Sequence, residues 1–273
     1  MVEKMRTKFL MTVSALAIAT PAMAADLYTP YVPPAANDPI YSPQQMVVGH
    51  LQLGLGYADL EEYIFDDDFS GVGVFEGAGR ANIAFGTMNF EIETGGFSFF
   101  SDGSSYSSIG AAGHLWTKLN GAAIGAFAAV NFPTGATIGS VGLEGEAYLG
   151  NVTLGAQGGY NWGDGGLDFW SAAGWADYYV TPDFRLGGEV DYFNSDGSNL
   201  WIAALDTEYR FSGTPFSLWG EVSYSMPDGG SDVVAGLLGF RVFMDGAGTS
   251  LHQHDMDVPW DGGLLDQGLL LSF

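Results

Sequence analysis

Residues 184–211 read FRLGGEVDYFNSDGSNLWIAALDTEYRF, and side chains of two kinds alternate along this stretch on either side of a turn-forming centre. One parity is apolar or aromatic: Phe184, Leu186, Val190, Tyr192, Trp201, Leu205 and Tyr209. The opposite parity is charged: Arg185, Glu189, Asp191, Asp206, Glu208 and Arg210. Because successive side chains of a strand point to opposite faces, the stretch predicts two strands with one apolar and one charged face.

The same alternation runs from residue 46 to residue 243 and predicts an all-β fold. Turn-forming clusters divide it into twelve segments: 47–59, 78–87, 88–97, 105–118, 121–132, 138–150, 152–162, 169–181, 184–194, 199–211, 216–226 and 231–243. Most segments have the length that a tilted strand needs to cross a bilayer. Short connections such as Gly150-Asn151 alternate with longer ones such as 60–77, which is typical of transmembrane barrels.

The alternative for such a chain is a soluble sandwich of two sheets. The formal net charge is −24, yet 47% of the residues are hydrophobic, and Lys118 is the one lysine after residue 8. A soluble sandwich normally carries many surface lysines, whereas a barrel in lipid separates an apolar exterior from charge in the lumen and loops. We therefore predict a closed antiparallel transmembrane β-barrel of about 12 strands, with short periplasmic turns and longer extracellular loops.

The ends of the chain are expected to lie outside the barrel domain, 46–243. Residues 1–24 combine a basic start, a short apolar run and small residues up to Ala24, which predicts an export signal cleaved before Ala25. Residues 25–45 are proline-rich and predict an extended leader, and residues 244–273 predict a periplasmic tail, with 264–273 as an alternative closing strand. The chain has no cysteine, which excludes disulfides, and its acidity excludes nucleic acid as a partner.

The cleavage site, the twelve segments and the C-terminus together carry a family resemblance. The last residues include Asp266, Gly268, Leu271 and the final Phe273. The chain resembles the small outer-membrane β-barrel and porin-like proteins of Gram-negative bacteria, in which such an end is the assembly signal. The resemblance implies a place in the bacterial outer membrane, contact with lipid and lipopolysaccharide, the barrel-assembly machinery as a partner, and a homo-oligomer as one option. The signal normally forms the last strand, whereas the twelfth segment here ends at 243.

The charged parity of the predicted strands faces the lumen. Its acidic members are Glu91, Glu93, Glu144, Glu146, Asp177, Glu189, Asp191, Asp206, Glu208 and Glu221. Its arginines are Arg80, Arg185, Arg210 and Arg241, of which Arg80 is expected in the outer half and the others near the periplasm. An acidic lumen above a basic rim selects cations, whereas a network of ion pairs filling a narrow barrel conducts little, and both interpretations stay open here.

Loop 60–77 carries the strongest candidate for a metal site. Asp66, Asp68 and Glu76 approach the spacing of a calcium loop, but Gly77 stands where that loop needs a glutamate. We expect loosely bound Ca²⁺ or Mg²⁺ at most. His252 and His254 are too few for a stable zinc site, and the composition around them predicts a solvated tail.

No catalytic constellation stands out in the sequence. The histidines outside the tail are His50 and His114, and no G-x-S-x-G motif occurs, so we expect neither an enzyme nor a resident cofactor. The predicted function is passive, cation-preferring diffusion of small cationic or neutral solutes. The alternative is a non-conducting structural or surface-interaction protein, with loop 60–77 as the binding element because it is long enough to fold over the mouth.

Overall fold

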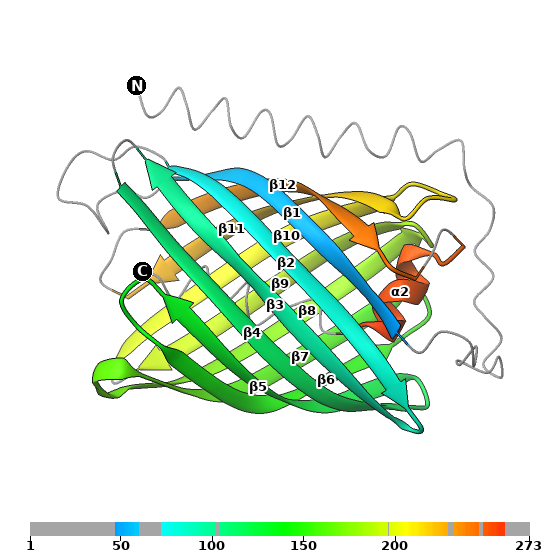
Figure 1. The fold of residues 1–273 in the computed structure, drawn as a ribbon, viewed down its shortest axis with the longest axis horizontal. Coiled ribbons are helices and arrows are strands. Elements are labelled where there is room, and N and C mark those ends of the chain that lie inside the picture. The colour runs from blue at the N-terminus through cyan, green and yellow to red at the C-terminus, as the bar shows by residue number, and fades with distance from the viewer. Residues whose placement is uncertain are drawn as a thin grey trace. The chain divides into compact units, whose positions relative to one another are not determined.

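Twelve antiparallel strands in the described part of the chain form one closed barrel, as predicted (Figure 1). The computed structural model describes residues 47–59, 72–101, 104–195, 197–228, 232–245 and 248–259. The strands are β1 Val47–Asp59, β2 Val72–Phe85, β3 Met88–Ser101, β4 Ser104–Leu119, β5 Ala122–Pro133, β6 Ile138–Tyr148, β7 Val152–Gly163, β8 Leu167–Thr181, β9 Phe184–Ser195, β10 Ser198–Arg210, β11 Phe216–Pro227 and β12 Val233–Phe243. Each strand pairs with its neighbours in the chain, and β12 closes the ring onto β1.

Two short helices accompany the strands in the described residues: η2 (Asp164–Gly166) and α2 (Leu251–Asp257). Neither is long and apolar enough to span a bilayer. Because β12 already pairs with β1, the ring closes without residues 264–273, which lie outside the described residues.

The two ends of the barrel differ in their connections. We call the end where β1 begins and β12 ends the terminal mouth, and the end where β1 stops at Asp59 the loop mouth. Turns at the terminal mouth are tight, and Gly86, Gly121 and Gly150 hold φ angles of 65°, 74° and 73°, which glycine adopts without steric cost. At the loop mouth most connections are shorter than predicted, because the strands extend further. For example, residues 102–103 alone separate β3 from β4.

The outer wall of the barrel is apolar. Large side chains exposed on it include Leu51, Leu53, Leu55, Ile109, Leu143, Leu205 and Phe240. Leu205 is 72% exposed and lies in the middle of β10, where a water-soluble protein would bury it. Exposed aromatic side chains near the strand ends, such as Trp162, Tyr178 and Trp201, form the interfacial girdles expected of a membrane barrel. The exterior is therefore suited to contact with the lipid acyl chains of a bilayer.

The largest error in a predicted strand boundary is at the start of β2. β2 begins at Val72, whereas the sequence pattern placed its start at 78 and assigned 72–77 to a loop. The glycines at 71, 73 and 77 obscured an alternation in which Val72, Val74 and Glu76 all point inward and are buried. The connection between β1 and β2 is therefore 60–71, and these residues lie outside the described part of the chain.

Inward-facing glycines make room for aromatic rings that lie against the inner wall. A Cβ on Gly155 would lie 1.9 Å from a ring atom of Trp175, and one on Gly239 would lie 2.5 Å from the ring of Trp219. Such distances are far below van der Waals contact, so each tryptophan occupies the space that a larger residue would need.

We expect Gly155→Ala to destabilise the barrel by about 1–3 kcal/mol, because the added methyl group overpacks the Trp175 site. Urea titration of the detergent-solubilised barrel, followed by the loss of its heat-modifiable gel band, measures this change. Gly158→Ala on the same strand is the matched control, since its Cβ would meet its nearest atom, the Ser171 carbonyl oxygen, at 3.7 Å. Equal destabilisation by both substitutions would contradict the packing argument.

Candidate lumenal site and terminal plug

The part of the lumen next to the loop mouth is lined by buried apolar side chains. This apolar collar consists of Ala58, Val72, Val74, Phe97, Phe99, Ile138, Phe169, Phe193, Ile202, Val233, Ala235 and Leu237. Trp219 belongs to the same buried cluster but lies nearer the terminal end of β11, where it pairs with Glu208. From the sequence we predicted acidic side chains on the lumenal face of the strands, whereas next to the loop mouth this face is apolar. The correction follows from parity, because Phe97 and Phe193 occupy the same face of their strands as Glu93 and Asp191.

On β2 to β6 the mid-lumen wall is an ion-paired cluster. His114 contacts Glu144 at 3.0 Å through Nδ1 and Glu93 at 3.4 Å through Nε2, and the Arg80 guanidinium lies 3.3 Å from Glu93. Glu91 is fully buried beside this cluster, and no hydrogen-bond donor of the described residues reaches either of its carboxylate oxygens. Two negative charges are thus balanced here, while Glu91 is not.

Arg80 lies in the terminal half of the barrel, not in the outer half predicted from the sequence. In the register of β1 and β2 it pairs with His50, close to the start of β1. The error follows from the misplaced start of β2, which made residue 80 look early in its strand. All four lumenal arginines therefore lie toward the terminal mouth.

A second cluster joins β8 to β12 around Glu208. Arg241 donates to this buried carboxylate at 2.7 Å, Arg185 lies 3.7 Å from it, and Ser217 donates a hydrogen bond to it. Arg185 also donates to Asp206 at 3.0 Å and lies 3.7 Å from Asp177. One buried carboxylate between two guanidinium groups holds the terminal half of this wall together.

Above this cluster lies an acidic wall, which we define as Glu189 and Asp191 of β9 and Glu221 of β11. Among the described residues neither Asp191 nor Glu221 forms an ion pair, and Glu221 stands directly beside Asp206 in the register of β10 and β11. Glu189 and Glu221 keep partial solvent exposure. At Asp191 and Glu221 the acidic wall therefore presents carboxyl groups that have no cationic partner among the described residues. Glu146, the remaining predicted lumenal acid, accepts a hydrogen bond from the Trp175 indole at 3.2 Å.

Helix α2 lies inside the terminal mouth (Figure 1). Ser250 caps its N-terminus by accepting a hydrogen bond from the Gln253 backbone N–H. Leu251 is fully buried with Tyr179 and Phe243. Its backbone N–H donates to Asp183 in the turn between β8 and β9, at 3.2 Å. Both apolar packing and hydrogen bonds thus hold the helix against the inner wall.

The contacts of α2 reach opposite walls. Asp257 binds Lys118 of β4 at 2.6 Å, and its carbonyl accepts a hydrogen bond from Asn82 of β2 at 3.0 Å. Asp255 accepts a hydrogen bond from the Tyr179 hydroxyl of β8 at 2.8 Å and lies 3.5 Å from Arg185 of β9. Since β2 and β8 stand opposite each other in the ring, α2 lies across the lumen as a terminal plug.

The histidines of this helix are not solvated, contrary to the expectation from composition. His254 is fully buried, its Nδ1 lies 2.7 Å from Asp245 and its Nε2 lies 2.9 Å from Nδ1 of His50. Arg210 donates to the same Asp245 at 3.0 Å. The polar partners of this segment come from strands far away in the sequence, which local composition cannot reveal.

The predicted metal residues do not come together in the described residues. Glu76 lies in β2 and accepts a hydrogen bond from Gln52 at 2.7 Å, while Asp66 and Asp68 lie outside the described part of the chain. Ala24, Ala25, Asp266, Gly268, Leu271 and Phe273 lie outside it as well. Within the described ranges no group of three or more acidic or histidine side chains is arranged to hold a metal ion.

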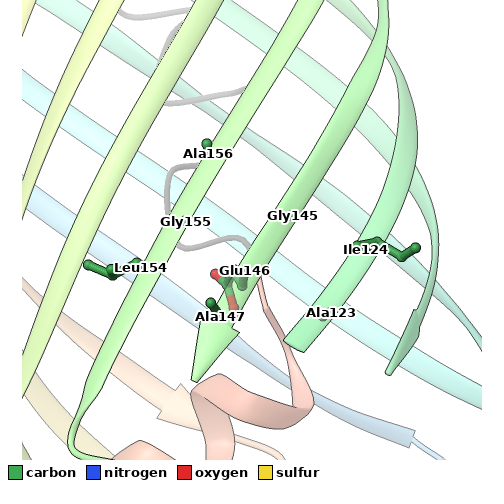
Figure 2. A pocket seen from close by; sticks show the side chains of 8 residues that line it. All are labelled: Ala123, Ile124, Gly145, Glu146, Ala147, Leu154, Gly155 and Ala156. Atoms are coloured by element: carbon green, nitrogen blue, oxygen red, sulfur yellow. The ribbon is translucent and has the colours of Figure 1, made fainter. Parts of the chain in front are cut away.

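A hollow of about 350 Å³ interrupts the wall at β5 to β7 (Figure 2). Its outward lining is apolar, with Gly145, Ala147 and Ala156 between the larger Ile124 and Leu154. The small residues leave a dent among side chains that face lipid. The dent therefore belongs to the lipid-facing surface.

Comparison with known proteins gives a likeness of fold. No protein-family model and no curated protein matches the sequence. A structure described as "KdgM porin in complex with disordered oligogalacturonate" matches with a TM-score of 0.51 and 10% identity, over 72% of this chain and 98% of that chain. The COG4313 outer membrane channel from Pseudomonas putida F1 matches with a TM-score of 0.51 and 13% identity, over 78% of this chain and all of that chain.

An anion-selective porin from Comamonas acidovorans matches with a TM-score of 0.44 and 8% identity, over 72% of this chain and 98% of that chain. Identities this low carry the fold and no more. Together with the apolar exterior, the first two matches identify the chain as an outer-membrane-type β-barrel with the fold of porins and channels.

We expect Glu208→Gln to destabilise the barrel by about 3–5 kcal/mol, because it leaves the two arginines beside Glu208 without their shared buried charge. Urea unfolding in detergent measures the loss. Asp164→Asn, in the exposed η2 turn, is the control and should change the free energy of unfolding by less than about 0.5 kcal/mol. A Glu208→Gln barrel as stable as the control would refute a structural role for the cluster.

Proposed function

We propose that this barrel is a passive outer-membrane channel for small solutes and that it prefers cations. The observation that carries the proposal is the acidic wall: Asp191 and Glu221 have no cationic partner among the described residues, and Glu221 and Glu189 are partly exposed. Carboxylates that line a lumen and have no cationic partner lower the potential along the path, so they attract cations and repel anions.

The orientation of the path follows from the connections. Tight turns and both barrel ends lie at the terminal mouth, which in outer-membrane barrels is the periplasmic side. The loop mouth then faces the cell exterior. A solute would meet the apolar collar first and the arginines last, and the acidic wall begins at the inner edge of the collar, where Asp191 pairs with Ile202 and Glu221 pairs with Leu237. This order places the carboxylates without a cationic partner at mid-height and the ion-paired arginines below them.

The apolar collar limits what can pass. Its buried aromatic side chains narrow the outer part of the lumen, and an apolar constriction disfavours hydrated ions because it offers no replacement for their water. We therefore propose a small conductance and an upper size limit that is set by the collar. The acidic wall then decides between the ions that are small enough to enter.

A second candidate is a structural barrel that does not conduct. The complete burial of Glu208, Glu91 and His254 favours it, since closely packed ion pairs fill space that water would otherwise occupy. Twelve strands give a lumen that side chains can either line or fill. The two candidates differ in one measurable property, which is ion flow through the refolded protein.

The refolded barrel is measured in planar bilayers with different potassium chloride concentrations on the two sides. We expect the sign of the reversal potential to show that potassium permeates more easily than chloride. Glu221→Gln should move this potential toward zero because it removes a charge from the acidic wall, whereas Glu221→Asp should preserve it. The preference should weaken as salt rises, since screening shortens the reach of the carboxylates. A chloride preference would overturn the cation channel, and absent conductance would favour the structural barrel.

A further inference from the structure

We propose that α2 is a detachable plug of the terminal mouth, held by a latch of Asp245, His254 and His50 that opens when acid adds protons to it. The proposal rests on the channel function above, because it describes how one mouth of that channel is opened. The plug itself is a structural feature, so its release can be measured separately from ion flow.

The latch connects three separate parts of the chain. Asp245 follows β12, His254 lies on α2 and His50 lies on β1, and the two links between them measure 2.7 Å and 2.9 Å. The Phe243 ring packs edge-on against His254 at 4.5 Å between centroids and excludes water from one side. His254 therefore has both ring nitrogens engaged by protein groups.

The hydrogen bonds of the latch require that one of the two facing imidazole nitrogens carries no proton. Nδ1 of His254 faces a carboxylate and therefore carries a proton, which it donates to Asp245. The contact between the two imidazoles needs one shared proton between Nε2 of His254 and Nδ1 of His50. If both rings are fully protonated, two N–H groups face each other and the hydrogen bond is lost.

The charges around the latch oppose a second positive charge. His50 lies within electrostatic range of Arg241 on β12, Arg80 on β2 and Arg185 on β9, in addition to His254. At the other end, Arg210 of β10 already shares Asp245 with His254. A proton added to His50 is therefore repelled by Arg241, Arg80, Arg185 and His254.

Two further groups respond to acid in the same direction. Burial raises the pKa of Asp245, but the hydrogen bonds from His254 and Arg210 outweigh this effect and hold its pKa below the ordinary value. Ionised Asp245 thus stabilises the docked helix at pH values above the ordinary pKa of aspartate. This stabilisation is lost as the pH falls through the lowered pKa of Asp245. Burial also lowers the pKa of His252, against the opposing charge of Asp255, and its ring stacks on Tyr179 at 4.1 Å. A released His252 takes up a proton more readily than the docked one, so acid again favours release.

The remaining charged contacts of α2 are spread over several strands. Asp257 binds Lys118 and Asp255 binds Tyr179 and Arg185, while Asp183 accepts the N–H of Leu251. Burial raises the pKa of Asp183, despite its hydrogen bond from Leu251, so at this contact acid favours the docked helix and opposes release. Because the helix spans opposite walls, its release frees the whole terminal mouth and not one side of it.

Release is measured first without reference to conductance. The chain has no native cysteine, so Leu251→Cys places one thiol at a buried position of α2, and Ser212→Cys places one on an exposed turn. The ratio of their maleimide labelling rates cancels the effect of pH on thiol chemistry. When the pH is lowered from about 7.5 to about 5, we expect this ratio to rise at least about tenfold. A group whose pKa is one unit higher in the released state than in the docked state changes the equilibrium by this factor.

The latch itself is tested with His50→Gln, whose amide can donate to His254 but cannot be protonated. We expect this variant to need lower pH for the same rise in the labelling ratio. A ratio that stays constant with pH, or a rise that is the same in His50→Gln and in the parent protein, overturns the proposal. A rise in a barrel that conducts at neither pH supports the plug and refutes the channel function instead.

The consequence for the channel is tested by tethering. In a Lys118→Cys, Asp257→Cys variant, a reducible two-headed thiol reagent joins α2 to β4. Acid should raise the conductance of the untethered protein and leave the conductance of the tethered protein unchanged. After the tether is reduced, acid should raise the conductance again. Acid-induced conductance that persists with the tether in place would show that the helix is not the gate.

Discussion

The requirement that every backbone polar group be paired inside the membrane is the constraint on which this structure depends. A closed ring of strands meets the requirement, since β12 completes the hydrogen bonds of β1 and leaves no open edge. Closure then forces each strand to divide its side chains between lipid and lumen. The Leu205 side chain and the Glu208 side chain lie three residues apart on β10, one among the most exposed and the other fully buried. From this division follow an apolar exterior and an interior that has to accommodate the charge of the chain.

Charge inside the lumen is organised along the barrel axis. The basic groups gather toward the terminal mouth, where Arg185, Arg210 and Arg241 are balanced by carboxylates. The carboxylates without cationic partners stand nearer the middle, and apolar side chains line the part next to the loop mouth. Buried ions are tolerated when their partners are close, so the paired groups build the wall. The unpaired groups are those that can act on a passing ion.

Sequence reasoning predicted the twelve strands because the signal is local: side-chain direction alternates with every residue. It failed at Val72, where glycines masked the alternation, and it misplaced Arg80 as a result. The lumenal acids were predicted from parity, but their partners were not, because pairs such as Arg80 with Glu93 depend on strand register. Helix α2 escaped prediction for a related reason. The groups that bind it, from His50 to Arg185, are distant in the sequence, and its seven residues carry too weak a signal alone.

The central claim is that neighbouring positions of one strand face different media, lipid on one side and a charged lumen on the other. Trp170 and Trp175 of β8 test it directly, since they are 63% and 6% exposed and point to opposite faces. The measurement is the fluorescence of two single-tryptophan proteins in bilayers whose acyl chains carry bromine, a contact quencher. We predict strong quenching of Trp170 and little quenching of Trp175. Equal quenching of the two would contradict the barrel with a lumen that lipid does not enter.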